Sequence, residues 1–295
     1  MNLPGPLVER LTEELGGPPA SVTAVGGGDV NHALRWVAPN GERFFVKWNA
    51  ALDSEVFLRE AQGLEALGAC RSALALPPIR AVGGDRQPGF LVLDWFETVS
   101  PSSRGWQVLG QGLAQLHRCT ADSFGFTADN FIGRLPQSND WDSSWTSFWV
   151  EQRIEPLLRD TVDRGLVDDR LQARLKALCA DASRFCDRAD VMPGLLHGDL
   201  WSGNVSWVSP ERPVVYDPAV YYGDREVELA FTELFGGFDA SFYTAYDKAY
   251  PLAPGYRARR PFWQLYPLLV HLSMFGGSYR SAVESAVAAA EMYAA

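Results

Sequence analysis

The pattern of apolar residues changes near residue 97, and this change constrains the fold more than any other feature of the sequence. Before it, short apolar runs separated by turn residues predict strands at 21–25, 32–37, 43–48, 79–82 and 90–93, and one helix at 53–67. After it, helical periodicity predicts helices at 106–117, 145–158, 168–184, 226–234 and from 262 to 274 onward. The sequence therefore predicts an α+β protein with a small β-rich lobe at residues 1–97 and a larger α-helical lobe at residues 98–295.

The predicted β-rich lobe begins with an antiparallel meander that carries two candidate charged residues. The first strand leads into three glycines at 26–28, and the pair Asn40-Gly41 supplies the turn between the second and third strands. Lys47 lies near the end of the third strand, and Glu60 lies on the helix that follows. We expect Glu60 to pair with Lys47, with Glu55 of the same helix as the alternative partner, because helix boundaries predicted from sequence shift by a few residues.

The acidic composition restricts the partners of the chain. It has 26 Lys and Arg residues against 36 Asp and Glu residues, which gives a formal net charge of −10. This charge is a poor match for nucleic acid or for the anionic face of a membrane. We therefore expect a small-molecule partner, with no binding to nucleic acid or to membranes.

The cysteines and the N-terminal sequence indicate a cytoplasmic protein. The 4 cysteines are scattered, without Cys-x-x-Cys spacing or the density of a disulfide scaffold, so we expect reduced thiols. Residues 1–17 lack the basic start and apolar run of a signal peptide. No segment reaches the roughly 18 apolar residues of a membrane-spanning helix.

Three side chains with oxygen donors lie near the ends of two neighbouring apolar runs in the second half of the chain. Asp199 and Asn204 follow one run, and Asp217 follows the next, so we expect the three to lie close together. Their oxygens are the ligands that Mg²⁺ bound to nucleotide phosphates requires. An Asp-x4-Asn spacing followed by a later Asp is typical of kinases, in which the first Asp orients the acceptor hydroxyl and accepts its proton. With Lys47 and Glu60 upstream, the order along the chain is that of a phosphoryl-transfer enzyme.

The neighbours of Asp199 allow more than one interpretation. Trp201 either packs in the core or exposes its indole, which would then stack on a sugar ring or its attached amine as a substrate-binding residue. We interpret His197 as a hydrogen-bonding brace for the loop rather than as a proton-transfer group. Asp199 itself lies among apolar residues, where a carboxylate is costly to bury without a task or a partner.

The segment Leu195–Val205, with the sequence LLHGDLWSGNV, resembles the fructosamine kinases, which are also called ketosamine-3-kinases. Further matches to that family lie at residues 130–133, 216–219, 228–230 and 235–238, and the likeness extends from about residue 22 to residue 279. The triplet His-Gly-Asp alone would indicate only the wider aminoglycoside and choline kinase-like group of the protein kinase-like superfamily. The longer motif indicates a much smaller group of proteins.

The resemblance implies a two-lobed protein kinase-like fold and an ATP-dependent enzyme. Its reaction would be phosphorylation of the sugar 3-hydroxyl of ketoamines, such as the fructosamine, ribulosamine or erythrulosamine adducts of amines. In that family the phosphate makes the adduct labile and the free amine is recovered, which repairs glycated proteins. Glycated amines or glycated proteins would therefore be the substrates, and we expect a monomer.

The resemblance also implies which residues carry out the reaction. Asp199 would be the catalytic base, and Asn204 and Asp217 would bind Mg²⁺. Lys47 would contact the phosphates of ATP, and Glu60 would orient Lys47.

Other residues would hold the nucleotide, according to the same resemblance. Gly27 and Gly28 would cover the phosphates, although the segment departs from the Gly-x-Gly-x-x-Gly loop of protein kinases. Asp94, Trp95 and Phe96 match the hinge, where backbone groups would receive adenine.

Two other functions stay open. The first is an aminoglycoside or choline-type small-molecule kinase, which charge does not distinguish from a ketoamine kinase because all three kinds of acceptor are cations. The second is a non-catalytic pseudokinase that acts as a scaffold, which the presence of Lys47, Asp199, Asn204 and Asp217 disfavours.

Overall fold

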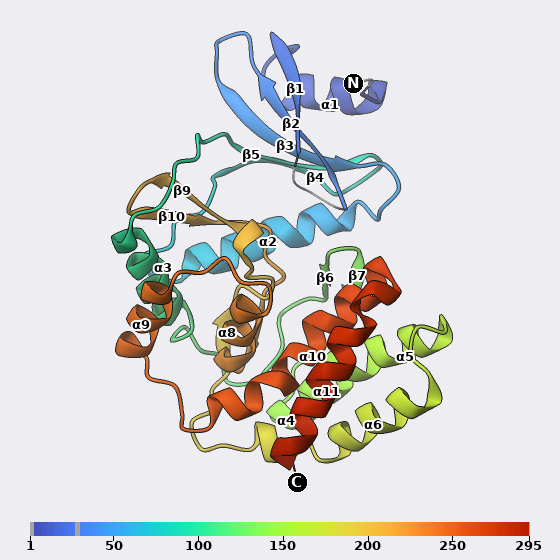
Figure 1. Cartoon of the computed structure of the whole chain (residues 1–295). Coiled ribbons are helices and arrows are strands. Elements are labelled where there is room, and N and C mark those ends of the chain that lie inside the picture. The colour runs from blue at the N-terminus through green and yellow to red at the C-terminus, as the bar shows by residue number, and fades with distance from the viewer. Residues whose placement is uncertain (1–2, 27–29, 295) are drawn as a thin grey trace.

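The structure is a computed structural model that describes residues 3–26 and 30–294, and it confirms the predicted α+β fold class. A β-rich part lies above a larger helical part (Figure 1). The elements of the β-rich part are α1 (Gly5–Glu14), β1 (Ser21–Val25), β2 (His32–Val37), β3 (Arg43–Asn49), α2 (Glu55–Ala69), β4 (Ile79–Gly83) and β5 (Gly89–Asp94).

The second part of the chain is mostly helical and includes several short strands. Its elements are α3 (Ser103–Leu116), β6 (Asn130–Ile132), β7 (Leu135–Gln137), α4 (Trp145–Trp149), the π-helical segment η1 (Val150–Ile154), α5 (Glu155–Asp163), α6 (Asp169–Ala180), α7 (Ser183–Cys186), β8 (Gly194–Leu196), the 3-10 turn η2 (Ser202–Asn204), β9 (Val205–Ser209), β10 (Arg212–Val215), β11 (Tyr221–Gly223), α8 (Arg225–Leu234), α9 (Ala240–Ala249), α10 (Tyr256–Phe275), the 3-10 turn η3 (Gly277–Tyr279) and α11 (Arg280–Ala294). Across residues 3–26 and 30–294, no helix is both long enough and apolar enough to cross a membrane.

Some helix boundaries differ from the sequence prediction. The helix predicted at residues 145–158 is present as the unbroken succession of α4, η1 and α5 and extends to Asp163. Its π-helical segment η1 lies just before Pro156, which has no N–H for a helical hydrogen bond. In place of the helix predicted at 168–184 there are two helices. The first, α6, ends at Ala180, and the short α7 begins at Ser183. Helices α1 and α9 lie where the sequence pattern predicts no helix, because only a few positions in each are buried.

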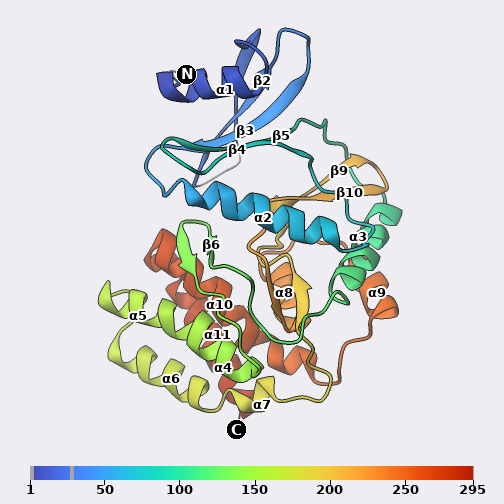
Figure 2. The same cartoon turned by 180° about the vertical axis from the view of Figure 1, so that it is seen from behind.

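Five antiparallel strands form one sheet in the order β1-β2-β3-β5-β4, and its two faces are covered by different helices. Side chains along β3 alternate between the faces, so Val46 packs with Leu7 of α1 while Phe45 packs with the residues of α2. Lys47, two residues from Phe45, shares the α2 face. Figures 1 and 2 both show α2 between the sheet and the helical part. This face of the sheet therefore looks toward the rest of the molecule.

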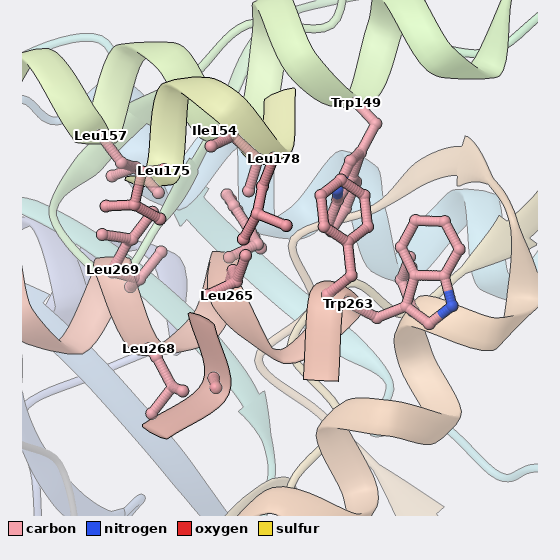
Figure 3. Close-up of a cluster of buried hydrophobic side chains, with 14 of the residues drawn as sticks. Trp149, Ile154, Leu157, Leu175, Leu178, Trp263, Leu265, Leu268 and Leu269 are labelled. Atoms are coloured by element: carbon pink, nitrogen blue, oxygen red, sulfur yellow. The ribbon is translucent and has the colours of Figure 1, made fainter. Parts of the chain in front are cut away.

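A large apolar core fixes the helical part. Figure 3 shows side chains from α4, η1, α5, α6 and α10 packed together, namely Trp149, Ile154, Leu157, Leu175, Leu178, Trp263, Leu265, Leu268 and Leu269. Each is less than a tenth exposed, and the rings of Trp149 and Trp263 meet edge to face at 5.5 Å. This packing holds α10 in place, and the C-terminal end of α10 reaches the functional site described below.

Cys70 and Cys119 form a disulfide, so the expectation of reduced thiols is wrong for this pair. Cys70 follows α2 and Cys119 follows α3, and their Cα atoms are 6.2 Å apart, inside the range that a disulfide requires. Spacing in the sequence does not reveal the pair, because the residues are 49 positions apart and only the folded chain brings the two helix ends together. Cys179 and Cys186 are free.

Reduction of this disulfide is expected to lower the free energy of unfolding by about 2 to 4 kcal/mol, because the crosslink restricts the unfolded chain. Urea denaturation with and without dithiothreitol measures the change. Cys70→Ser should have the stability of the reduced protein in both buffers. Cys179→Ser, the matched control, should keep the response to the reductant. Equal stability of the wild-type protein in both buffers would contradict the crosslink.

Candidate active site

Lys47 of β3 lies between two carboxylates from different parts of the chain. Its Nζ is 2.8 Å from Oε2 of Glu60 on α2 and 2.9 Å from Oδ1 of Asp217, which follows β10. Glu55, the alternative partner, instead pairs with Arg59 one turn along the same helix. The fold therefore joins Lys47, Glu60 and Asp217 at one point, although they are far apart in the sequence.

Burial and mutual charges together decide the ionisation of this cluster. Burial alone would lower the pKa of Lys47, but the carboxylates of Asp217 and Glu60 outweigh it and raise that pKa above its ordinary value. Burial raises the pKa of Glu60. Burial would also raise the pKa of Asp217, but the attraction of Lys47 outweighs it, so that this pKa is lowered. The cluster therefore presents a lasting cation beside an ionised Asp217.

Asp199 and Asn204 lie on the segment that leads from β8 to β9. Nδ2 of Asn204 donates to the backbone carbonyl and to Oδ2 of Asp199, at 2.8 and 2.9 Å. Burial, followed by the negative charge of Asp217, raises the pKa of Asp199 to about 8. A carboxylate with a raised pKa is a stronger proton acceptor than an exposed one, which suits general-base chemistry near neutral pH.

His197 connects the two halves of the site. Its Nε2 donates to the carbonyl of Tyr216 at 3.0 Å, and its Nδ1 accepts from the backbone N–H of Asp199 at 3.3 Å. Burial lowers the pKa of His197, which favours a neutral ring with one donor and one acceptor nitrogen. The next residue, Gly198, has a φ of +82°, and a Cβ there would collide with the carbonyl oxygen of Ala219. These contacts agree with the interpretation of His197 as a brace.

Glu228 on α8 supports the backbone of residues 197–198, just before Asp199. The sequence pattern assigns Glu228 no role. Its carboxylate accepts hydrogen bonds from the backbone N–H groups of His197, at 3.1 Å, and Gly198, at 2.7 Å. It also accepts from Nε2 of the buried His117, at 2.9 Å. Burial would raise the pKa of Glu228, but the hydrogen bond from His117 and the other donors outweigh it and lower that pKa. An ionised Glu228 therefore anchors the backbone immediately before Asp199.

Beside these supporting groups lies a cavity of about 750 Å³, whose walls come from both the β-rich and the helical parts. The polar side chains at its centre are Lys47, Glu60, Asp199, Asn204 and Asp217. The structure thus brings together the charged and amide side chains that are expected to act on the phosphates, the metal and the acceptor hydroxyl.

The predicted hinge forms another part of the wall. Asp94, Trp95 and Phe96 line the cavity. The N–H groups of Asp94 and Trp95 donate to the carbonyls of Pro78 and Arg43, at 3.0 and 3.1 Å, so both are used in holding the sheet together. The next backbone N–H along the chain is that of Phe96.

Two further predictions concern the phosphate loop and Trp201. Gly27 and Gly28 lie outside the described residues, whereas their neighbours Gly26 and Val30 line the cavity. Trp201 also lines the cavity and is half-buried, so its indole is not part of the apolar core.

Comparisons of sequence agree on one family. Residues 7–291 match the family model described as fructosamine kinase. A protein of Lactiplantibacillus plantarum named "Probable ketoamine kinase" is 38% identical over 263 residues, which cover 89% of this chain and 91% of that protein. The chloroplastic protein-ribulosamine 3-kinase of Arabidopsis thaliana is 35% identical over 280 residues, 94% of this chain and 84% of that protein.

Comparisons of structure agree with this result. A crystal structure from Thermobifida fusca, of a protein named "putative fructosamine-3-kinase", has a TM-score of 0.87 at 35% identity, and the match covers 97% of this chain and 98% of that one. An aminoglycoside phosphotransferase in complex with ADP and hygromycin B has a TM-score of 0.62 at 15% identity, covers 98% of this chain and 97% of that one, and is alike in fold alone. The two-lobed kinase-like fold is therefore confirmed. By its family model and its relatives, the chain belongs to the fructosamine kinase family.

Proposed function

We propose that the protein is an ATP-dependent kinase that phosphorylates the sugar 3-hydroxyl of ketoamines, the fructosamine, ribulosamine or erythrulosamine adducts of amines. The observation that carries this proposal is the double ion pair of Lys47 with Glu60 and Asp217, in the cavity that also contains Asp199 and Asn204. The fixed ammonium of Lys47 suits the phosphates of a nucleoside triphosphate, and the carboxylate of Asp199 in the same cavity suits an acceptor hydroxyl. The names of the relatives support the acceptor class.

ATP would lie along the cavity, with adenine at the hinge and the triphosphate at Lys47. Because the N–H groups of Asp94 and Trp95 are used by the sheet, we assign adenine recognition to the backbone of Phe96. Gly27 and Gly28 remain our candidates for covering the phosphates.

Magnesium fits the oxygen donors of Asn204 and Asp217. Nδ2 of Asn204 is used by Asp199, so the amide oxygen is the atom available to a cation. Asp217 has a lowered pKa, and its side chain is 33% exposed. One carboxylate and one amide suit Mg²⁺, which takes waters and phosphate oxygens as its other ligands. When bound, the ion would neutralise charge on the phosphates.

In the proposed reaction, Asp199 orients the 3-hydroxyl and accepts its proton. The hydroxyl oxygen forms a bond to the γ-phosphorus, the bond from that phosphorus to the β,γ-bridging oxygen breaks, and ADP leaves. Lys47, held by Glu60, stabilises the phosphate charge, and Asn204 keeps the Asp199 carboxylate in position through two hydrogen bonds. Positioning and fixed charges supply most of the acceleration.

The distribution of acidic residues favours ketoamines over aminoglycosides. Among the described residues that line the cavity, the acidic ones are Glu60, Asp94, Glu97, Asp199 and Asp217, which belong to the hinge or to the catalytic centre. An aminoglycoside carries several ammonium groups and would need further carboxylates on the acceptor side, whereas a ketoamine has one ammonium beside the reacting sugar.

We also propose a division into a nucleotide-binding lobe at residues 1–97 and a catalytic and substrate-binding lobe at residues 98–295, because the hinge residues 94–96 lead from one to the other. The reaction would serve deglycation, with glycated amines or glycated proteins as substrates. We further propose a cytoplasmic monomer.

A panel of acceptors tests the proposed function. Fructosyl-, ribulosyl- and erythrulosyl-lysine, kanamycin and choline are each incubated with ATP and Mg²⁺, and ADP release is measured together with the position of the new phosphate. We expect 3-phosphorylation of at least one ketoamine and loss of activity when EDTA removes Mg²⁺. Turnover of kanamycin or choline alone would identify the other type of kinase, and no turnover of any acceptor would favour the scaffold.

A further inference from the structure

Four aromatic side chains gather on one wall of the cavity. The ring centroids of Phe235 and Tyr279 lie 4.7 and 5.0 Å from that of His271. Phe275 lies 5.6 Å from His271 and 6.0 Å from Tyr279. All four line the same cavity as Asp199, and we refer to them as the aromatic cluster.

Two members of the cluster, His271 and Phe275, come from the end of α10, and Tyr279 follows in η3. His271 and Phe275 lie one helical turn apart, so they share a face of the helix. Gly276 has a φ of +85° and ends α10, and η3 then brings Tyr279 back toward the same face. The preceding turns of α10 pack into the core shown in Figure 3, which positions this wall of the cavity.

The fourth member connects the cluster to the catalytic loop. Phe235 follows α8, and Gly237 lies two residues later. Gly237 packs so closely on the loop that carries Asp199 that a Cβ there would be 2.6 Å from Oγ of Ser202. The aromatic wall therefore begins beside the catalytic loop.

Two rings of the cluster are exposed to an extent that apolar packing does not explain. Phe235 is 41% exposed and Phe275 is 43% exposed. Aromatic surface left open in a cavity marks a binding site for a ligand that can cover it. The faces of aromatic rings also attract cations within about 6 Å of the ring centre. The acidic residues of the cavity lie at the hinge and the catalytic centre, so a cation on this wall would be held by rings.

We propose that Phe235, Phe275 and Tyr279 form a subsite for the protonated secondary amine of the ketoamine and for the carbon chain attached to it. This inference rests on the proposed function, which puts the 3-hydroxyl at Asp199. In a ketoamine the nitrogen is bonded to C1, two carbon atoms from the reacting C3, so the amine lies beside the reacting group on the side away from ATP. The cluster then selects acceptors by their amine, while Asp199 acts on the sugar 3-hydroxyl that all these ketoamines share.

A pair of matched acceptors tests the subsite. The first is a ketoamine with a charged secondary amine, and the second is the ether in which oxygen replaces that nitrogen, so the two have nearly the same shape but differ in charge and in N–H donors. We expect the wild-type protein to have a kcat/KM about five- to thirty-fold higher for the amine, the factor that one cation–π contact supplies.

Variants then assign the preference to the cluster. Phe275→Leu and Phe235→Leu keep an apolar side chain but remove the ring, and both positions are exposed enough to tolerate the change. We expect each to reduce the ratio of the two kcat/KM values severalfold. Phe131→Leu, at a lining phenylalanine outside the cluster, is the matched control and should keep the wild-type ratio.

The outcomes separate this inference from the proposed function. Equal kcat/KM values of the wild-type protein for both acceptors would overturn the subsite and leave ketoamine phosphorylation intact, and this comparison needs no variant to fold. An unchanged ratio in both cluster variants would also overturn it. If neither acceptor is phosphorylated, the proposed function fails and the subsite fails with it.

Discussion

Replacing Asp199 with Asn is expected to lower kcat by about 10²- to 10⁴-fold, because an amide cannot accept the proton of the acceptor hydroxyl. The Kd for ATP should change little, since Lys47, Glu60 and Asp217 stay in place. The amide oxygen of the new residue can still accept the hydrogen bond from Asn204, which lies 2.9 Å from the carboxylate in the wild-type protein. An ADP-release assay measures kcat, and calorimetric titration measures the affinity for ATP.

The same variant should be more stable than the wild-type protein at pH 7. Burial raises the pKa of Asp199 to about 8, so ionising this carboxyl in the folded protein costs stability above its pKa in the unfolded chain. Asn carries no charge and removes that cost. Asp181→Asn, an exposed change of the same kind, is the control and should alter neither kcat nor stability. A kcat for Asp199→Asn within tenfold of the wild-type value would show that another group acts as the base.

Glu228→Gln is expected to lower the free energy of unfolding by about 3 to 5 kcal/mol, the usual cost of removing one charged partner from a buried cluster. The Gln side chain presents an NH₂ group where the carboxylate accepts from the N–H groups of His197 and Gly198. At least one of those buried donors then loses its partner, and the loop that carries Asp199 shifts. We therefore expect kcat to fall with little change in the Kd for ATP, since Glu228 does not line the cavity.

The pH dependence identifies the cause of this effect. The pKa of Glu228 lies below the ordinary value of 4.5, so its stabilising contribution is present above that value and is lost as the pH falls through the lower pKa of the folded protein. The stability difference between the wild-type protein and Glu228→Gln should therefore shrink in acid. Glu233→Gln, on the same helix but bonded to Tyr256 and Arg260, is the control and should leave kcat unchanged. Equal stability of Glu228→Gln and the wild-type protein would remove Glu228 from its anchoring role.

The strands of the β-rich part are encoded by local patterns, and the prediction from sequence is accurate for them. Strands β1, β2 and β3 coincide with short apolar runs separated by turn residues, and the pair Asn40-Gly41 has the chemistry of a tight turn. The helical part is less well predicted. The helix predicted at residues 145–158 contains a π-helical segment and runs on to Asp163, and α9 buries too few positions for its period to stand out.

The sequence also identifies some features of the candidate site and not others. Asp199, Asn204 and Asp217 are recognisable from their spacing, because residues at the ends of neighbouring apolar runs lie close together. The sequence does not determine which carboxylate of the helix pairs with Lys47. Glu55 and Glu60 lie on one helix, and only the rotation of α2 against the sheet determines that Glu60 faces Lys47.

The sequence by itself determined the order of the elements, the polar residues of the catalytic loop and the family to which they point, because these depend on neighbours along the chain. The tertiary structure alone decided the pairing of Lys47 with Asp217, the disulfide of Cys70 with Cys119, and the support of the loop by Glu228. Each of these contacts joins residues that are far apart in the chain. Whether such groups meet depends on how helices and sheets pack, and local propensity carries no record of that packing.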